Sequence, residues 1–195
     1  MGKNPRNQKF NYHRFRPQSQ PGAGVKLIIM EALKIIPYSR NFLKIFEREK
    51  KKILKATAAN ETHHIGSTAV PGLGGKGIVD IMIGVKDWGK VKDIIKKLKK
   101  IGFKRVHPEE KERIFLSEHR GPYPDNVHLH IVRIGSKQYK DLLSFKNYLR
   151  KNKKEIKRFF ELKLEWLKIA KGDRDKYGKL KEKYVKEILR KTSKV

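Results

Sequence analysis

Short stretches of this chain alternate apolar and polar residues, a pattern typical of strands that bury one face. In residues 78–85, every second residue from Val79 to Ile83 is apolar and shares one face, whereas Asp80 and Met82 share the other. We expect such strands to form one sheet on which helices pack. The same alternation or a short apolar run predicts further strands at 63–65, 103–106, 113–117 and 127–133.

Apolar residues at helical spacing lie between and after these strands. The clearest helix is predicted at 90–101, and two more in 25–59, separated by a break at Pro37. Three helices are predicted at the C-terminal end, over 137–151, 153–170 and 174–191. Their expected inward-facing rows are Leu142, Phe145 and Leu149, then Ile156, Phe160 and Leu167, then Tyr177, Leu180, Tyr184 and Ile188.

The order of these elements predicts an α/β (α+β) protein in three parts. Residues 1–24 hold bases but no acid and no apolar face, which favours a basic tail that is disordered alone. Residues 25–136 are predicted to form an α/β core, and residues 137–195 basic helices packed on that core.

The charge of the chain indicates a function as well as a fold. The 49 Lys and Arg against 20 Asp and Glu leave a net charge of +29 on 195 residues. Contacts with a polyphosphate release counterions, so such an excess of cations favours a nucleic-acid partner. Surface adaptation in a heat-adapted protein and an acidic protein partner are the alternatives, although heat adaptation normally multiplies Lys and Glu together.

Two segments are the candidate RNA contacts. In the tail, aromatic residues between the bases suit stacking on nucleobases, and the predicted helix at 90–101 carries a face that is nearly all lysine. A solvated face is the alternative for that helix. The candidate RNA-binding residues are Lys3, Arg6, Lys9, Arg14 and Arg16 in the tail, and Lys92, Lys96, Lys99 and Lys100 in the helix.

Other features of the composition narrow the setting. The chain has no cysteine, which excludes disulfides and thiolate zinc sites and favours the cytoplasm. Its longest apolar stretch, 25–36, is interrupted by charges and is shorter than the roughly 20 residues that cross a bilayer, so no membrane partner is expected. Abundant lysine without cysteine also indicates a thermophile.

The candidate chemistry lies in residues 64–81, HIGSTAVPGLGGKGIVDI. A strand enters a Gly-Ser turn, whose amides can hold phosphate oxygens if a helix follows, and the chain returns through a glycine-rich loop to a strand with one carboxylate. This arrangement predicts a nucleotide site. Its candidate phosphate ligands are His64, Gly66, Ser67, Thr68 and Lys76, with Asp80 as the candidate catalytic carboxylate.

The string resembles the signature of the GrpB-like family, which belongs to the nucleotidyltransferase superfamily with the polymerase-beta-like fold. The resemblance implies a small mixed sheet flanked by helices, with nucleotide phosphate at Gly66-Ser67 and metal near Asp80. It extends over most of the chain. Further matching positions are Tyr38, Phe42, Phe46 and Glu49, then His128, Leu129 and His130, then Phe145, Tyr148, Leu149, Lys163, Tyr177, Lys181 and Tyr184.

The chain departs from an active nucleotidyltransferase in its carboxylates. Such enzymes place two carboxylates at positions i and i+2 of one strand and a third on a neighbouring strand, so that two divalent ions hold the transferring phosphoryl group. Here Asp80 is followed at i+2 by Met82, whose thioether does not bind magnesium. The family tends to have proline after its lysine, where this chain has Gly77.

The strand at 127–133 offers a replacement for the missing carboxylates. Its alternation places His128 and His130 on one face, and if the strands are neighbours both imidazoles join Asp80. A His-His-Asp set can bind zinc or manganese, whereas the alternatives are structural hydrogen bonds or phosphate contacts. The sequence establishes no cofactor; a divalent metal and a nucleoside triphosphate are the candidates.

Two functions follow from these observations. The favoured prediction is an RNA-binding protein on a nucleotidyltransferase-like fold, associated with ribosomal RNA and ribosomal proteins, because the charge argument stands whether or not the site is active. The alternative is an active nucleotidyltransferase acting on an RNA or small-molecule acceptor. The single carboxylate argues against this alternative.

Overall fold

The computed structural model describes residues 34–57, 59, 61–105, 113–118 and 127–193. The predicted tail and its bases Lys3, Arg6, Lys9, Arg14 and Arg16 lie outside these residues, as does most of the helix predicted at 25–36. Residues 34–36 are not helical, because Ile36 pairs with Gly75 in an isolated antiparallel bridge. The first described helix is α1, Asn41–Thr57, after the predicted break at Pro37.

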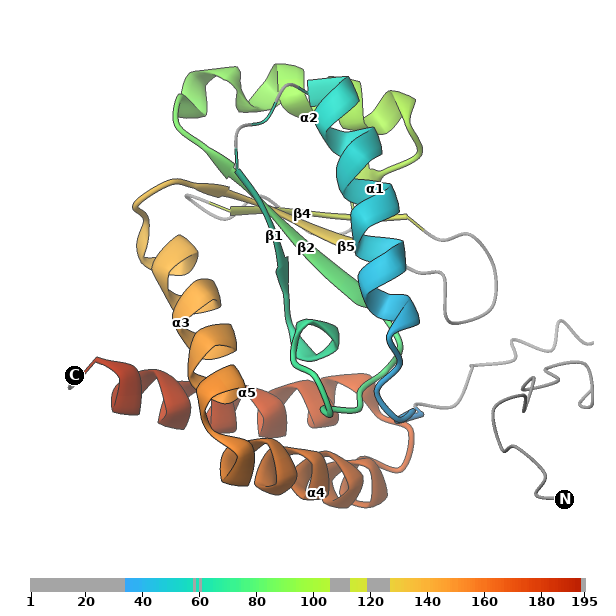
Figure 1. Cartoon of the computed structure of the whole chain (residues 1–195), viewed down its shortest axis with the longest axis vertical. Helices are drawn as coiled ribbons and strands as arrows, with labels where there is room; N and C mark the ends of the chain where they lie inside the picture. The colour runs from blue at the N-terminus through green and yellow to red at the C-terminus, as the bar shows by residue number, and fades with distance from the viewer. Residues whose placement is uncertain (1–33, 58, 60, 106–112, 119–126, 194–195) are drawn as a thin grey trace, which may run out of the picture. The chain divides into compact units, whose positions relative to one another are not determined.

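The centre of the fold is a five-stranded mixed sheet in the order β1-β2-β5-β4-β3 (Figure 1). β2 and β5 are parallel, and the other neighbours are antiparallel. The predicted strands are confirmed with small changes at their ends. They are β1 Glu61–Ile65, β2 Val79–Val85, β3 Lys104–Arg105, β4 Arg113–Glu118 and β5 Val127–Arg133.

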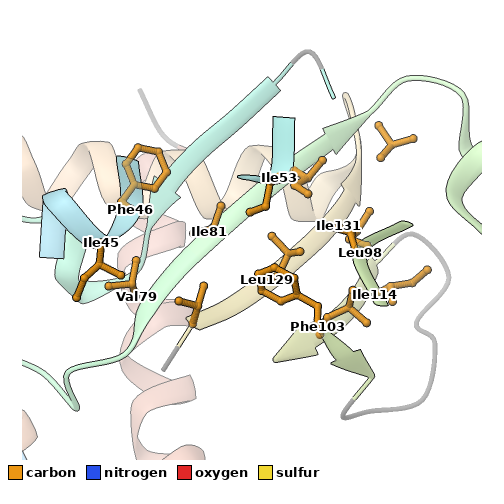
Figure 2. Close-up of a cluster of buried hydrophobic side chains, with 14 of the residues drawn as sticks. Ile45, Phe46, Ile53, Val79, Ile81, Leu98, Phe103, Ile114, Leu129 and Ile131 are labelled. Atoms are coloured by element: carbon orange, nitrogen blue, oxygen red, sulfur yellow. The ribbon is translucent and has the colours of Figure 1, made fainter. Parts of the chain in front are cut away.

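One face of the sheet packs against α1 and α2, Val91–Lys100, which follows the short 3-10 turn η3, Trp88–Lys90. Figure 2 shows this core, in which Val79 and Ile81 lie among apolar side chains of α1 and α2. Ile83 belongs to the same cluster. Each such fully buried aliphatic side chain contributes roughly 1.5–3 kcal/mol. The face of β2 that alternation predicted to be buried is therefore buried, although most of its opposite face is covered as well.

The other face packs against α3, Lys137–Lys151, which begins where the Ser136 hydroxyl accepts a hydrogen bond from the Tyr139 amide. Ile65, Met82 and Val132 pack there against apolar side chains of α3. Met82 is fully buried in this layer, so the position that would carry a second carboxylate is part of the core.

The last two helices, α4 (Lys153–Ala170) and α5 (Arg174–Thr192), form a second core with α3 and the glycine-rich loop before β2. Phe159 and Tyr184 stack at its centre, with ring centroids 4.3 Å apart. The predicted row of α4, Ile156, Phe160 and Leu167, packs against this core but is only half-buried. The buried row is the adjacent one, Phe159, Lys163, Trp166 and Ala170.

None of the helices that the structure describes combines the length and apolar character needed to cross a bilayer.

Candidate functional site

The candidate site lies where β1 ends and β2 begins. The register places Asp80 of β2 beside Ile65 of β1 and beside His128 of β5. β1 is followed directly by Gly66 and then by the one-turn 3-10 helix η2, Ser67–Ala69. The turn is too short to supply a helix dipole. The condition under which its amides were expected to hold phosphate, a following helix, is therefore not met.

Gly66 lies against the Asp80 carboxylate. Its φ of 70° and ψ of −167° belong to a region that only glycine adopts readily, and a Cβ there would collide with Asp80 Oδ2. The backbone of the turn can approach the carboxylate because this position has no side chain.

The glycine-rich loop before β2 forms another part of the site, to which it contributes Gly75 and Lys76. Ile36 and Gly75 exchange two backbone hydrogen bonds of 2.7 and 2.9 Å. A Cβ on Gly74 would lie 2.5 Å from the Phe160 ring and 2.6 Å from the Ile36 carbonyl oxygen. The loop is thus fixed between α4 and the segment before α1, which places Gly75 and Lys76 at the site.

Lys163 of α4 is the most deeply buried cation here, with 2% of its surface exposed. Its Nζ donates to Ser67 Oγ and to the Gly74 carbonyl oxygen, each at 2.6 Å. Burial, reinforced by the nearby Lys181 and Lys76, holds the Lys163 pKa well below its usual value, while Asp80 opposes the shift. Because Ser67 Oγ accepts from Lys163, its own proton is left to donate to a ligand oxygen.

Two further lysines line the same pocket. Lys76 Nζ lies 4.4 Å from the Tyr177 ring centroid, and burial together with Lys181 and Arg174 lowers the Lys76 pKa to about 8. Lys181 is exposed on α5. The pocket has a volume of about 140 Å³, and its described lining holds three lysines and one carboxylate. The lining residues are Ser67, Thr68, Gly75, Lys76, Ile78, Asp80, His128, Lys163, Tyr177 and Lys181.

Asp80 meets both predicted histidines. Its Oδ1 lies 3.4 Å from His128 Nδ1 and 3.5 Å from His130 Nε2. Burial raises the Asp80 pKa, but the two imidazoles outweigh this effect and hold it well below its usual range. The predicted convergence of the three side chains is confirmed, because β2 and β5 are neighbours.

The three side chains do not fit a metal ion. Arg113 Nη2 donates to His130 Nδ1 at 3.1 Å, so this nitrogen carries the lone pair and the proton is on Nε2, which faces Asp80. Burial lowers the His130 pKa, which favours this neutral ring. Both ring nitrogens are therefore engaged. Within the described residues, no group of three His, Asp or Glu is arranged to hold a metal, and the buried Met82 adds no hard ligand.

Two of the predicted phosphate ligands have internal roles instead. Thr68 is 2% exposed; its hydroxyl donates to the Ile78 carbonyl and therefore accepts from His64 Nε2, 3.0 Å away. His64 stacks on Phe46, with ring centroids 4.7 Å apart, and burial lowers its pKa to about 4. His64 does not line the Asp80 pocket, so of the predicted ligands the pocket contains Ser67, Thr68 and Lys76, with Gly66 beside Asp80.

The predicted lysine face of α2 lies elsewhere. Lys92, Lys96, Lys99 and Lys100 are all exposed. Because α2 follows the C-terminal end of β2 and Asp80 lies near its N-terminal end, the two cationic surfaces are at opposite ends of the sheet (Figure 1).

The sequence pattern indicated no role for Lys163 and Lys181 beyond their match to the family, and it placed Tyr177 in the inward-facing row of the helix predicted at 174–191. Lysines on an amphipathic helix normally belong to its solvated face. The available signal was the position of Lys163 on α4, in the same row as the apolar residues Phe159, Trp166 and Ala170.

Comparisons with known proteins agree with this architecture. The family described as GrpB protein matches residues 32–191. A UPF0157 protein of Halalkalibacterium halodurans is 27% identical over 83% of this chain and 83% of its own length. The glutamate-rich protein GrpB of Alkalihalophilus pseudofirmus is 28% identical over 80% of this chain and 92% of its own.

A solved structure shares the fold. The crystal structure of the conserved protein GrpB from Enterococcus faecalis superposes with a TM-score of 0.73 and 26% identity, covering 83% of this chain and 98% of that one. The match confirms the resemblance to the GrpB-like family stated from the sequence, together with the mixed sheet flanked by helices that it implied. By its sequence and by its fold, the chain belongs to the GrpB family.

Proposed function

We propose that this protein binds RNA, with ribosomal RNA and ribosomal proteins as its partners, and that the Asp80 pocket holds one phosphate group of that RNA. The observation that carries the proposal is the set of three lysines, Lys76, Lys163 and Lys181, around Ser67 in a pocket with a single described carboxylate. Compact ammonium groups bind phosphate as point charges, and the Ser67 hydroxyl supplies a further donor.

The size of the pocket supports a phosphate in preference to a whole nucleotide. At about 140 Å³, it is well below the roughly 300 Å³ at which clefts begin to hold complete small ligands. A group the size of phosphate fits between the lysines. The net charge of +29 then supplies the attraction for the rest of the polymer.

The same geometry argues against the alternative of nucleotidyl transfer. Two-metal chemistry needs several carboxylates on adjacent strands. Here Met82 is buried in the core, and His130 already uses both ring nitrogens. The role left for Asp80 is to orient His128 and His130 and to limit the excess of positive charge in the pocket.

The test measures binding of the full chain to a ribosomal RNA fragment by fluorescence anisotropy. The Lys76→Gln/Lys181→Gln variant removes two pocket cations, and we expect it to bind at least tenfold more weakly. The matched control, Lys179→Gln/Lys183→Gln, removes two exposed charges that lie outside the pocket on α5, the helix that carries Lys181. It should weaken binding less than threefold.

Three results would overturn the proposal. One is the absence of RNA binding at low salt, and another is an equal loss in the two double variants. The third is transfer of label from a nucleoside triphosphate to RNA that Asp80→Asn abolishes, which would establish the enzyme instead.

A further inference from the structure

A second cleft lies at the β1 edge of the described sheet, on the other side of the η2 turn from the Asp80 pocket. Its walls come from β1, from the start of α1 and from the last turns of α3, and its volume is about 320 Å³. Figure 1 shows β1 running between α1 and α3. Thr68 lines both cavities, and its internal hydrogen bonds make it part of the wall between them.

The cleft is strongly cationic. Lys50, Lys146 and Arg150 line it, and its described lining residues include no Asp or Glu. Burial and the proximity of Arg150 lower the Lys146 pKa, as expected for cations gathered without a neutralising partner. The Glu61 carboxylate, 3.6 Å from His63 Nε2, is engaged by the Tyr139 hydroxyl. These positive charges suit an anionic ligand.

One wall of the cleft is apolar. Tyr38, Leu43 and Phe46 form it, and Leu43 is 52% exposed, next to the buried Phe42 on α1. An exposed leucine beside an aromatic ring is the kind of surface on which a planar base packs. The cleft therefore offers a cationic end and an apolar, aromatic end.

One buried polar atom of the lining, Thr62 Oγ1, has no hydrogen-bond partner in the described part of the chain. Buried polar atoms are normally paired, so an atom left in this state beside a cleft is available to a ligand.

From these four features we infer that the cleft at the β1 edge binds a nucleotide unit, with its phosphate at Lys146 and Arg150 and its base against Tyr38 and Leu43. Its volume lies within the range of roughly 300–1,000 Å³ typical of small-ligand sites, unlike that of the Asp80 pocket. The site is separate from the proposed phosphate pocket, and it can exist whether or not that pocket binds RNA.

Isothermal titration calorimetry on the full chain tests the site with adenosine, cytidine, guanosine and uridine 5′-monophosphates. Lys146→Gln/Arg150→Gln should weaken binding of the preferred nucleotide at least tenfold. Lys140→Gln/Lys151→Gln removes two exposed charges from the same helix and should weaken it less than twofold. Lys76→Gln/Lys181→Gln, in the other pocket, should also leave it unchanged within twofold.

Two comparisons complete the test. Tyr38→Ala should weaken the nucleotide but not ribose 5-phosphate, because only the base contacts that wall. A 5′-phosphorylated RNA trinucleotide that binds tighter than the mononucleotide assigns the site to RNA, and the reverse order assigns it to free nucleotides.

The inference fails if no nucleotide binds, if ribose 5-phosphate binds as tightly as every nucleotide, or if the control pair on α3 loses as much affinity as Lys146→Gln/Arg150→Gln. Because the site is tested with small ligands, its failure is distinct from a failure of ribosomal RNA binding. Melting curves of each variant identify any that do not fold.

Discussion

At the scale of single residues, His64 has the clearest consequence for stability. Its ring is stacked on Phe46 and hydrogen-bonded to Thr68, and burial lowers its pKa to about 4 from an ordinary value of 6.5. Between these two values the unfolded chain takes up a proton at His64 that the folded chain does not. Stability contributed by neutral His64 is therefore present above pH 6.5 and is lost progressively as the pH falls towards 4.

We predict that His64→Gln, which keeps a donor for Thr68 but does not titrate in this range, makes stability less dependent on pH. Between pH 7 and pH 5 the wild-type chain should lose about 1–2 kcal/mol more of its unfolding free energy than the variant. Urea denaturation at the two pH values measures the difference. Equal losses in both proteins would show that His64 is not protonated preferentially in the unfolded chain.

At the scale of elements, the turn after β1 depends on Gly66 for two separate reasons. Its backbone conformation is one that other residues avoid, and its missing side chain makes room for Asp80. Gly72, in the same loop, also has a positive φ, of 83°, but a Cβ there would meet nothing within 4 Å. Substitutions at the two glycines therefore distinguish the cost of backbone strain from the cost of a steric clash.

We predict that Gly72→Ala costs about 1–2 kcal/mol, the ordinary penalty of a left-handed backbone. Gly66→Ala should cost at least ~2 kcal/mol more, because it must also displace the Asp80 carboxylate. Chemical denaturation provides both values. If the two substitutions cost the same, the close approach of Gly66 to Asp80 does not contribute to stability.

The elements also show what alternation and spacing can predict. All the strands that the structure describes were found from short apolar patterns, because a sheet with two covered faces fixes which residues point inward. The convergence of Asp80 with His128 and His130 followed from period 2 once β2 and β5 were assumed to be neighbours. The buried row of α4 did not follow, because Phe159 and Phe160 are adjacent and Lys163 occupies the middle of that row. The burial of Lys163 is explained only by its hydrogen-bond partners, Ser67 and Gly74, and these are distant from it in sequence.

At the scale of the whole molecule, the net charge of +29 includes lysines on separate surfaces. The lysines of α2 are exposed and lie at the end of the sheet opposite the Asp80 pocket, so an RNA that contacts both must extend along the protein. Contacts of this kind add to the salt dependence of binding, since each phosphate neutralised releases counterions.

We predict that replacing Lys92, Lys96, Lys99 and Lys100 with glutamine lowers the slope of log affinity against log salt concentration by about 3, from roughly 0.7 per contact with single-stranded RNA. Replacing four exposed lysines of α4, at positions 153, 154, 157 and 168, removes the same charge and leaves the chain at the same net charge. This control should change the slope by less than 1, because a slope counts local contacts and a remote charge alters mainly the long-range attraction. Equal changes in the two variants would mean that α2 is a solvated face and that the chain attracts RNA through its total charge alone.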